Sequence, residues 1–240
     1  MPIADLANPT RFLAVSGRIL PWLWGVTLAA LAAGLVLSFQ APPDYQQGEM
    51  VRIMFIHVPF AWLSMACFAV MAVASLGTLV WRHPLADVAA KSAAPIGAAF
   101  TFLALVTGSL WGKPTWGTYW VWDARLTSEL VLLFLYFGFI ALANAFEDPR
   151  RGDRAAALLA LIGLVNLPII YFSVHWWNTL HQGSSVSFKG TSMHVQMLQS
   201  MLLVAVSFWM YSIGTSLVRV RAIILERESR TQWVRALKGA

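Results

Sequence analysis

The sequence predicts an all-α polytopic membrane protein with six transmembrane helices. Of its 240 residues, 58% are hydrophobic and only 12% are charged. A soluble domain of this length would expose much of that apolar surface to water, which is unfavourable. Six runs without Asp, Glu, Lys or Arg are each long enough to cross a hydrocarbon core, which takes roughly 20 helical residues. They are residues 19–38, 55–80, 92–111, 130–146, 155–174 and 196–218.

The first three runs each carry a distinct boundary signal. The first is too long for the h-region of a secretory signal, and no small-x-small cleavage site follows it before Pro42, so we expect a retained helix. The second begins near His57, and Pro59 then falls in the first turn, where its missing N–H costs nothing. The third ends at Trp111, where an aromatic connection begins.

The last three runs complete the predicted bundle. The fourth follows the aromatic connection directly. The fifth contains Asn166 two positions before Pro168, a pair that predicts a packed kink with a satisfied side chain. The sixth follows His194, and the mixed-charge tail after Arg219 is expected to be helical. Because no linker, repeat or low-complexity segment occurs, residues 1–240 are predicted to form a single six-helix transmembrane domain.

Basic residues are distributed unequally between the two sides of the predicted helices. Most Lys and Arg lie in the N-terminus, the C-terminus and two of the connections. The other three connections hold only Arg52, Lys113, Arg125 and Lys189. This bias predicts that both termini are cytoplasmic and that residues 39–54, 111–129 and 174–195 face the opposite compartment. The net charge of +6 is therefore a signal of topology, and we expect no nucleic-acid partner.

Several functions are disfavoured by what the sequence lacks. No charge falls within the six runs, whereas pumps, proton-coupled carriers and ion channels keep paired acids or bases at depth. No Walker-type glycine loop occurs, so we expect no ATP hydrolysis by this chain. No zinc-binding His-Glu-x-x-His helix or serine elbow is present, and the single Cys67 is expected to pack as a small hydrophobe. We therefore predict a protein that is not an enzyme.

The connection at residues 111–128 carries the most unusual pattern in the chain. It holds four tryptophans, two glycines, an aspartate and an arginine, namely Trp111, Gly112, Trp116, Gly117, Trp120, Trp122, Asp123 and Arg125. Flat π-surfaces, bare backbone and a few charges suit a large, flat, partly anionic ligand. The alternative is an interfacial aromatic belt, but a belt scatters single Trp and Tyr residues at helix ends.

This connection also has a helical period. If residues 116–127 form a short surface helix, Trp116, Trp120, Asp123 and Thr127 share one of its faces. An amphipathic helix lying on the bilayer has the same period, although it does not explain a face that mixes Trp with Asp.

His57 and His181 are predicted to lie on the same outer face as the aromatic connection. Taken alone, each is more simply interpreted as an interfacial or loop histidine that makes a hydrogen bond. Together, two histidines that flank a tryptophan-rich surface suit axial ligation of a haem iron from both sides. The haem propionates would need cations, and Arg52 and Arg125 are placed for that role. Asp123 would orient the guanidinium of Arg125 or a Trp N–H.

The sequence from Trp111 to Ser128 resembles the tryptophan-rich WWD signature of haem-handling proteins. The continuation Arg125-Leu126-Thr127-Ser128, the chain length and the six runs resemble the CcmC family of bacterial cytochrome c maturation. The same family is indicated by Tyr45-Gln46-Gln47-Gly48, Ile56-His57-Val58-Pro59 and Trp176-Trp177-Asn178-Thr179-Leu180-His181-Gln182-Gly183-Ser184. The resemblance spans nearly the whole chain.

This resemblance implies both a ligand and partners. His57 and His181 would be the axial ligands of haem b, held at the periplasmic face of the bacterial inner membrane. Haem would pass to the membrane-tethered chaperone CcmE, which attaches it covalently through its own histidine. The ATP-binding-cassette pair CcmA and CcmB and the small subunit CcmD would complete the complex in the lipid bilayer. His175 and His194 match no family function and receive no role.

Three other functions use the same residues. A bis-histidine membrane cytochrome holds its haem ligands deep in the membrane between facing helices, whereas both histidines here are predicted at the outer edge of the membrane. A permease-like subunit of a haem exporter requires a polar path through the membrane, which the six runs lack. A haem lyase of the WWD superfamily would be longer or carry additional histidines.

Overall fold

The computed structural model describes residues 8–83, 85–181, 183, 185–187 and 190–238. Among these residues the chain forms eight α-helices, two short helical segments of other types and one two-stranded sheet. The α-helices are α1 (Pro9–Gln40), α2 (Met54–Leu76), α3 (Ala86–Trp116), α4 (Ala124–Asn144), α5 (Pro149–Gly163), α6 (Asn166–Trp176), α7 (Val195–Arg227) and α8 (Gln232–Lys238). The 3₁₀-helix η2 (Glu49–Ile53) leads into α2, and the π-helix η3 (Gly77–Trp81) extends it.

Six helical segments are long and apolar enough to cross a membrane, which confirms the predicted fold class. They are Pro9–Gln40, Glu49–Trp81, Ala86–Trp116, Ala124–Asn144, Pro149–Trp176 and Val195–Arg227. Five of the predicted runs fall wholly inside these segments. The fourth differs, because the helix begins at Ala124, ahead of the uncharged run, and ends at Asn144.

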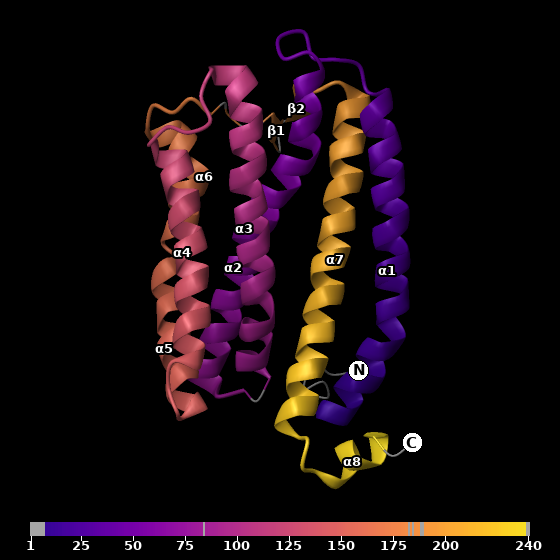
Figure 1. The fold of residues 1–240 in the computed structure, drawn as a ribbon, viewed down its shortest axis with the longest axis vertical. Coiled ribbons are helices and arrows are strands. Elements are labelled where there is room, and N and C mark those ends of the chain that lie inside the picture. The colour runs from indigo at the N-terminus through magenta and orange to yellow at the C-terminus, as the bar shows by residue number, and fades with distance from the viewer. Residues whose placement is uncertain (1–7, 84, 182, 184, 188–189, 239–240) are drawn as a thin grey trace.

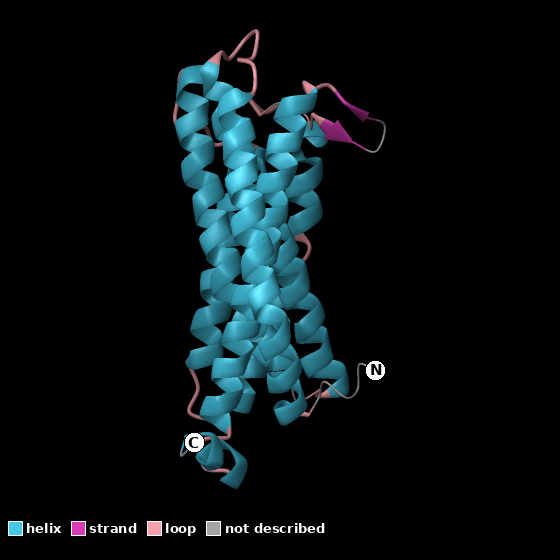
Figure 2. Ribbon diagram, turned by 90° about the vertical axis from the view of Figure 1, so that its right-hand side faces the viewer, coloured by secondary structure: helices cyan, strands magenta, loops and turns pink. Residues whose placement is uncertain are grey.

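The helices run side by side along the long axis of the bundle (Figure 1). α1 packs along α7, and α2 packs along α3 and also contacts α7 and α5. α4 contacts α3, α5 and α6. The N-terminus and α8 lie at one end of the bundle (Figure 1). The antiparallel strands β1 (Val186–Ser187) and β2 (Gly190–Thr191) lie at the opposite end (Figure 2).

The fifth transmembrane segment is broken into α5 and α6. Pro168 has no N–H to donate to the carbonyl of Leu164, and that carbonyl instead accepts the N–H of Leu167 at 3.1 Å. At the break, Nδ2 of Asn166 donates to the carbonyl oxygen of Ser128 in α4 at 2.9 Å. The predicted packed kink with a satisfied Asn166 side chain is confirmed.

The aromatic connection is not a helix between residues 117 and 123. Gly117 adopts a left-handed φ of 79° and ends α3, with its N–H on the carbonyl of Lys113. The side chain of Asp123 then caps α4 by accepting the N–H of Leu126 at 2.8 Å. The conditional helix over residues 116–127 is therefore wrong, because a glycine stop and an aspartate start fall inside it.

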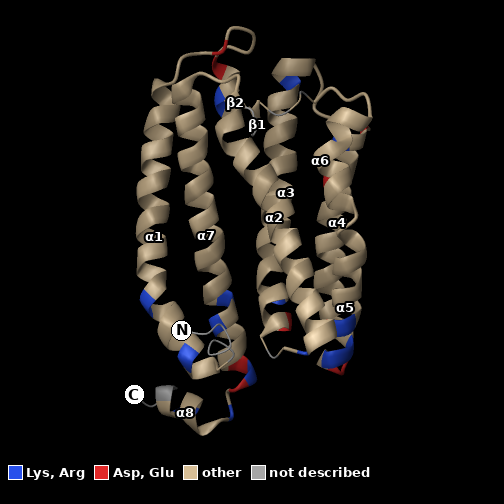
Figure 3. Ribbon diagram, turned by 180° about the vertical axis from the view of Figure 1, so that it is seen from behind, with Lys and Arg blue, Asp and Glu red and all other residues tan. Residues whose placement is uncertain are grey.

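The two ends of the bundle differ in charge, and charged residues also lie inside the bundle. Lys and Arg gather at the end that holds the termini (Figure 3). The expectation that no charge lies within the bundle is wrong, because α4 begins earlier than predicted and carries Arg125 and Glu129 into it. The Glu129 residue is only 7% exposed.

Candidate functional site

His57 lies near the start of α2 and is 8% exposed. Its Nδ1 lies 3.1 Å from the hydroxyl oxygen of Thr107 in α3. That hydroxyl donates its single proton to the carbonyl of Leu103 at 2.6 Å, so its oxygen acts as the acceptor toward His57. Nδ1 therefore carries the ring proton, and the lone pair of Nε2 is left for a metal or another donor. A metal-ligating histidine is commonly oriented in this way by its second nitrogen.

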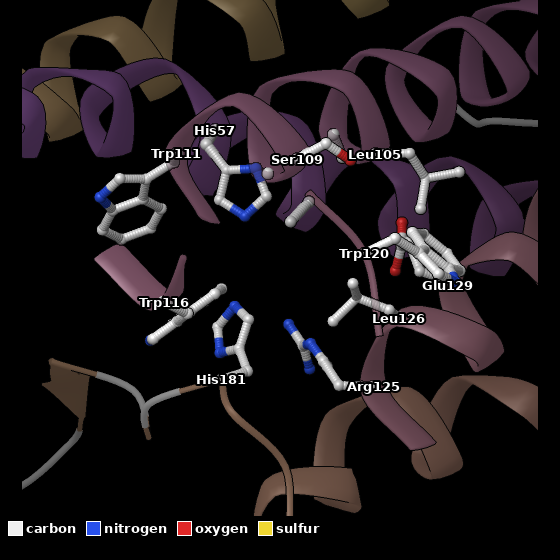
Figure 4. A pocket seen from close by; sticks show the side chains of 13 residues that line it. His57, Leu105, Ser109, Trp111, Trp116, Trp120, Arg125, Leu126, Glu129 and His181 are labelled. Carbon is white, nitrogen blue, oxygen red and sulfur yellow. The ribbon is translucent and has the colours of Figure 1, made fainter. Parts of the chain in front are cut away.

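The ring of His181 faces that of His57 across a cavity (Figure 4). The two ring centroids are 6.4 Å apart, and their planes are inclined by 40°. His181 follows α6 in a short turn, where its backbone N–H donates to the hydroxyl of Thr179 at 3.1 Å. Folding therefore brings the two predicted histidines together from segments far apart in the sequence.

The cavity between the histidines has a volume of about 510 Å³. It is lined by His57, Ala61, Ala104, Leu105, Gly108, Ser109, Trp111, Trp116, Trp120, Arg125, Leu126, Glu129 and His181. A second hollow of about 870 Å³ shares both histidines and continues toward α6 and α7. The histidine pair therefore stands between two largely apolar hollows, an arrangement that suits a disk whose edges extend to both sides.

Two tryptophans pack directly against the histidine pair. The ring centroid of Trp111 lies 5.7 Å from that of His57, and the ring centroid of Trp116 lies 6.0 Å from that of His181. Trp111 is buried, and its Nε1 donates to Oε1 of Gln47 at 2.7 Å. The ring orientation of Trp111 is thus fixed by a hydrogen bond to the segment that precedes α2.

The remaining tryptophans of the connection lie further out. Trp120 lines the cavity, and its ring centroid is 5.4 Å from that of Trp122 in an edge-on contact. Trp122 is 77% exposed and lines neither hollow. Its ring is available at the surface rather than inside the cavity.

The two glycines of the connection serve the backbone. A Cβ at Gly112 would lie 3.2 Å from the carbonyl oxygen of Thr118, so this position lets the connection fold back onto α3. Gly117 supplies the left-handed turn that ends α3, and a Cβ there would meet nothing within 4 Å. Gly108 approaches His57 closely, since a Cβ there would lie 2.8 Å from Cε1 of the ring.

The two predicted arginines have different positions. Arg125 lines both hollows beside His181, and its Nη1 donates to the carbonyl of Ile170 at 2.6 Å. Arg52 instead donates to the backbone carbonyls of Ser38 and Ala41 and pairs with Glu49. It joins the end of α1 to the start of α2 and lines neither hollow. Figure 4 accordingly includes only Arg125 of the pair.

The other polar residues of the site separate into two groups. Asp123 serves as the cap of α4, and His194 caps α7 by accepting the N–H of Gln196 at 3.3 Å. His175 lines the second hollow together with His57 and His181, while Glu129 lines the first. Glu129 was not predicted, although its position four residues after Arg125 on a helix places the two side chains on one face. Gln182 and Ser184 of the predicted motif lie outside the described residues.

The geometry of the two histidines fits one metal ion held between them. A metal–imidazole bond of ~2.0 Å puts a ring centre ~3 Å from the metal, so two rings on opposite sides of one ion lie ~6 Å apart. The observed centroid separation of 6.4 Å is close to that value. No group of three or more His, Cys, Asp or Glu side chains that could hold a metal occurs among the described residues. Two imidazoles would leave the other coordination positions of such an ion open.

Comparison with known proteins gives the family. The sequence model of the family CcmC, described as heme exporter protein C, matches residues 2–235. The chain belongs to the CcmC family. The family resemblance of the aromatic connection and its flanking segments is thus confirmed, and the protein is a multi-pass membrane member of that family.

Relatives in the CcmC family match over most of their length. The heme exporter protein C of Bradyrhizobium diazoefficiens is 60% identical over 232 residues, which cover 96% of this chain and 88% of the relative. That of Escherichia coli K12 is 52% identical over 234 residues, covering 97% and 95%. That of Paracoccus denitrificans is 40% identical over 240 residues, covering 96% and 100%. The match thus includes both histidine-bearing segments and the aromatic connection.

Proposed function

We propose that this chain is the haem-binding subunit of a cytochrome c maturation complex. Haem b enters as cargo, with its iron between His57 and His181 and its ring among Trp111, Trp116 and Trp120. The observation that carries the proposal is the facing pair of imidazoles, 6.4 Å apart between two largely apolar hollows. Two-sided histidine ligation with an apolar surround is a recurrent way to hold haem.

Each protein group has a defined part in holding the cargo. Thr107 keeps the proton of His57 on Nδ1, which leaves the lone pair of Nε2 directed at the cavity. Trp111 and Trp116 line the cavity and pack against the two imidazoles. Arg125 supplies a cation at the edge of the cavity, where a porphyrin carboxylate would bind. Iron bound in this way supplies reversible axial bonds, so a competing ligand can take the haem.

The proposal extends to the site's surroundings. The chain lies in the bacterial inner membrane. The end of the bundle with the histidine pair faces the periplasm, and the end with the termini faces the cytoplasm. Haem passes to the chaperone CcmE, with CcmA, CcmB and CcmD as neighbouring subunits. In this assignment the chain binds and transfers haem and performs no enzymatic step. The exposed ring of Trp122 beside the cavity offers a contact for the receiving partner.

The ligand assignment is tested by the absorption spectrum of the purified protein. We expect haem-loaded wild type to give a six-coordinate Soret spectrum. His57→Ala and His181→Ala should each remove one axial bond, change that spectrum and stop haem transfer to the chaperone. His83→Ala is the matched control, because His83 lies between α2 and α3, at the end of the bundle that carries the termini. Unchanged spectra in both site variants would contradict the assignment.

A further inference from the structure

Glu129 is an acidic side chain that the haem-binding proposal does not use. It lies in α4, is 7% exposed, and lines the same cavity as the two histidines and Arg125. Acidic side chains inside a membrane-spanning bundle are rare and unfavourable, and they commonly mark a functional site. Its position beside a ligand cavity therefore points to an action on the ligand.

A hydrogen-bond network holds the Glu129 carboxylate in place. The hydroxyl oxygen of Ser64 in α2 lies 2.6 Å from Oε1 of Glu129 and 2.8 Å from the carbonyl oxygen of Ala61. The hydroxyl of Tyr136, about two helical turns further along α4, donates to the carbonyl of Ser64 at 2.7 Å. Tyr136 reaches Ser64 by passing over Gly97 in α3, where a Cβ would lie 2.1 Å from the tyrosine oxygen. Ser64 of α2 thus links Glu129 and Tyr136 of α4 in one buried polar network.

The charges of the cavity are separated along the bundle. Glu129 is one helical turn further from the aromatic connection than Arg125, a distance of ~6 Å along α4. Ser64 lies two turns beyond His57, or ~10 Å along α2. Arg125 is engaged with the carbonyl of Ile170, whereas Glu129 is engaged with Ser64. In Figure 4, Arg125 lies on the His181 side of Leu126, and Glu129 lies on the opposite side of Leu126. The cavity therefore has a basic mouth and an acidic inner end.

We propose that Glu129 is a specificity-determining residue that selects which edge of a porphyrin enters the inner end of the cavity. In its ionised form this carboxylate repels porphyrin carboxylates in a poorly screened environment and leaves that end to an apolar edge. The acidic edge is thereby directed to Arg125. This inference rests on the proposed function and names its substrate class, an iron porphyrin with carboxylates on one edge and apolar substituents on the other.

Binding of two iron porphyrins to the purified full chain tests this proposal. One is haem b, and the other is an iron porphyrin in which carboxylate side chains replace both vinyl groups, giving four carboxylates. Wild type should bind haem more tightly than the tetracarboxylate compound. Glu129→Gln keeps the size of the side chain but removes its charge, so it should narrow that preference by about tenfold, mainly through tighter binding of the tetracarboxylate compound. Glu129→Asp should retain the preference.

The control is Asp153→Asn, which neutralises another acid, one that pairs with Lys91 in a different part of the bundle. This control should leave the ratio of the two affinities unchanged. If Glu129→Gln does not fold, Ser64→Ala combined with Glu129→Leu replaces both hydrogen-bonding partners by apolar groups, which is better tolerated than removing one. An unchanged ratio in the Glu129 variants, or equal affinities in wild type, overturns the proposal. If wild type binds neither porphyrin, the proposed function itself fails.

Discussion

At the residue scale, the imidazole of His57 is held between Thr107 and Gly108 on one face of α3. A Cβ at position 108 would lie 2.8 Å from Cε1 of the ring, so an alanine there has to displace the imidazole or separate α2 from α3. Overpacking of this kind costs ~1–3 kcal/mol. We expect Gly108→Ala to weaken haem binding by about tenfold or more and to shift the Soret band. Both effects are measured by titration of the purified variant with haem.

Gly25→Ala is the matched control for this change. Gly25 lies inside α1, where a Cβ would meet nothing within 4 Å, and alanine favours helix more than glycine does. Haem affinity in this variant should equal that of wild type. Equal affinities in both glycine variants would show that His57 does not need its present position to bind the ligand.

The residues proposed to bind haem were more predictable than those that position them. His57, His181, Trp111 and Trp116 have chemical identities unusual enough to be noticed in the sequence, and the structure brings them together. Thr107 and Gly108 could not be predicted, because their contact with His57 depends on how α2 and α3 align along their length. No local pattern records that alignment. Arg52 shows the converse, since its charge was noticed but its contacts with the end of α1 were not.

At the scale of elements, the side chain of Asn166 joins the break between α5 and α6 to α4. Nδ2 of Asn166 donates to the carbonyl of Ser128, next to Glu129 in the sequence. We expect Asn166→Leu to remove this hydrogen bond and lower the free energy of unfolding by about 1 kcal/mol. The same change should reduce haem binding, because α6 leads into the turn that carries His181. Thermal denaturation and haem titration measure the two effects.

Asn144→Leu is the matched control, because it removes an amide side chain without removing a hydrogen bond between helices. Nδ2 of Asn144 is exposed and donates to Ile140 of its own helix, one turn back. Asn144→Leu should therefore leave both the thermal midpoint and haem affinity close to wild type. A shared response of the two variants would mean that the bond from α6 to α4 has no special part in the site.

The ends of elements were less predictable than their existence. Long uncharged runs specify a membrane-spanning helix by hydrophobicity, and all six were found. The start of α4 was misplaced because the criterion of an uncharged run stops at Glu129, whereas Asp123 caps the helix earlier. This single displacement hid both the buried acid and the short length of the true aromatic turn, which spans residues 117–123. A capping signal outweighed a hydropathy boundary.

At the scale of the whole molecule, the two ends of the bundle differ both in charge and in the residues of the candidate site. Basic residues collect at the end with the termini (Figure 3). The histidine pair lies toward the other end, near the start of α2 and after the end of α6. Such a charge bias orients membrane proteins with the basic end in the cytoplasm. Composition and charge counting alone can supply this much of the fold. The packing partners of each helix, such as α1 along α7, required the three-dimensional structure.

The orientation of the bundle can be measured because Cys67 is the chain's single cysteine and is buried. In a Cys67→Ala background, one new cysteine at Tyr119 reports on the connection between α3 and α4, and one at Ser229 reports on the turn after α7. Both positions are exposed. A membrane-impermeant maleimide added to cells with a permeable outer membrane should label Tyr119→Cys but not Ser229→Cys, because positive charge holds the Ser229 end inside. Lysis should make both reactive, which shows that each thiol is accessible. Labelling of Ser229→Cys before lysis would reverse the orientation and place the histidine pair on the cytoplasmic side, where a periplasmic chaperone does not reach it.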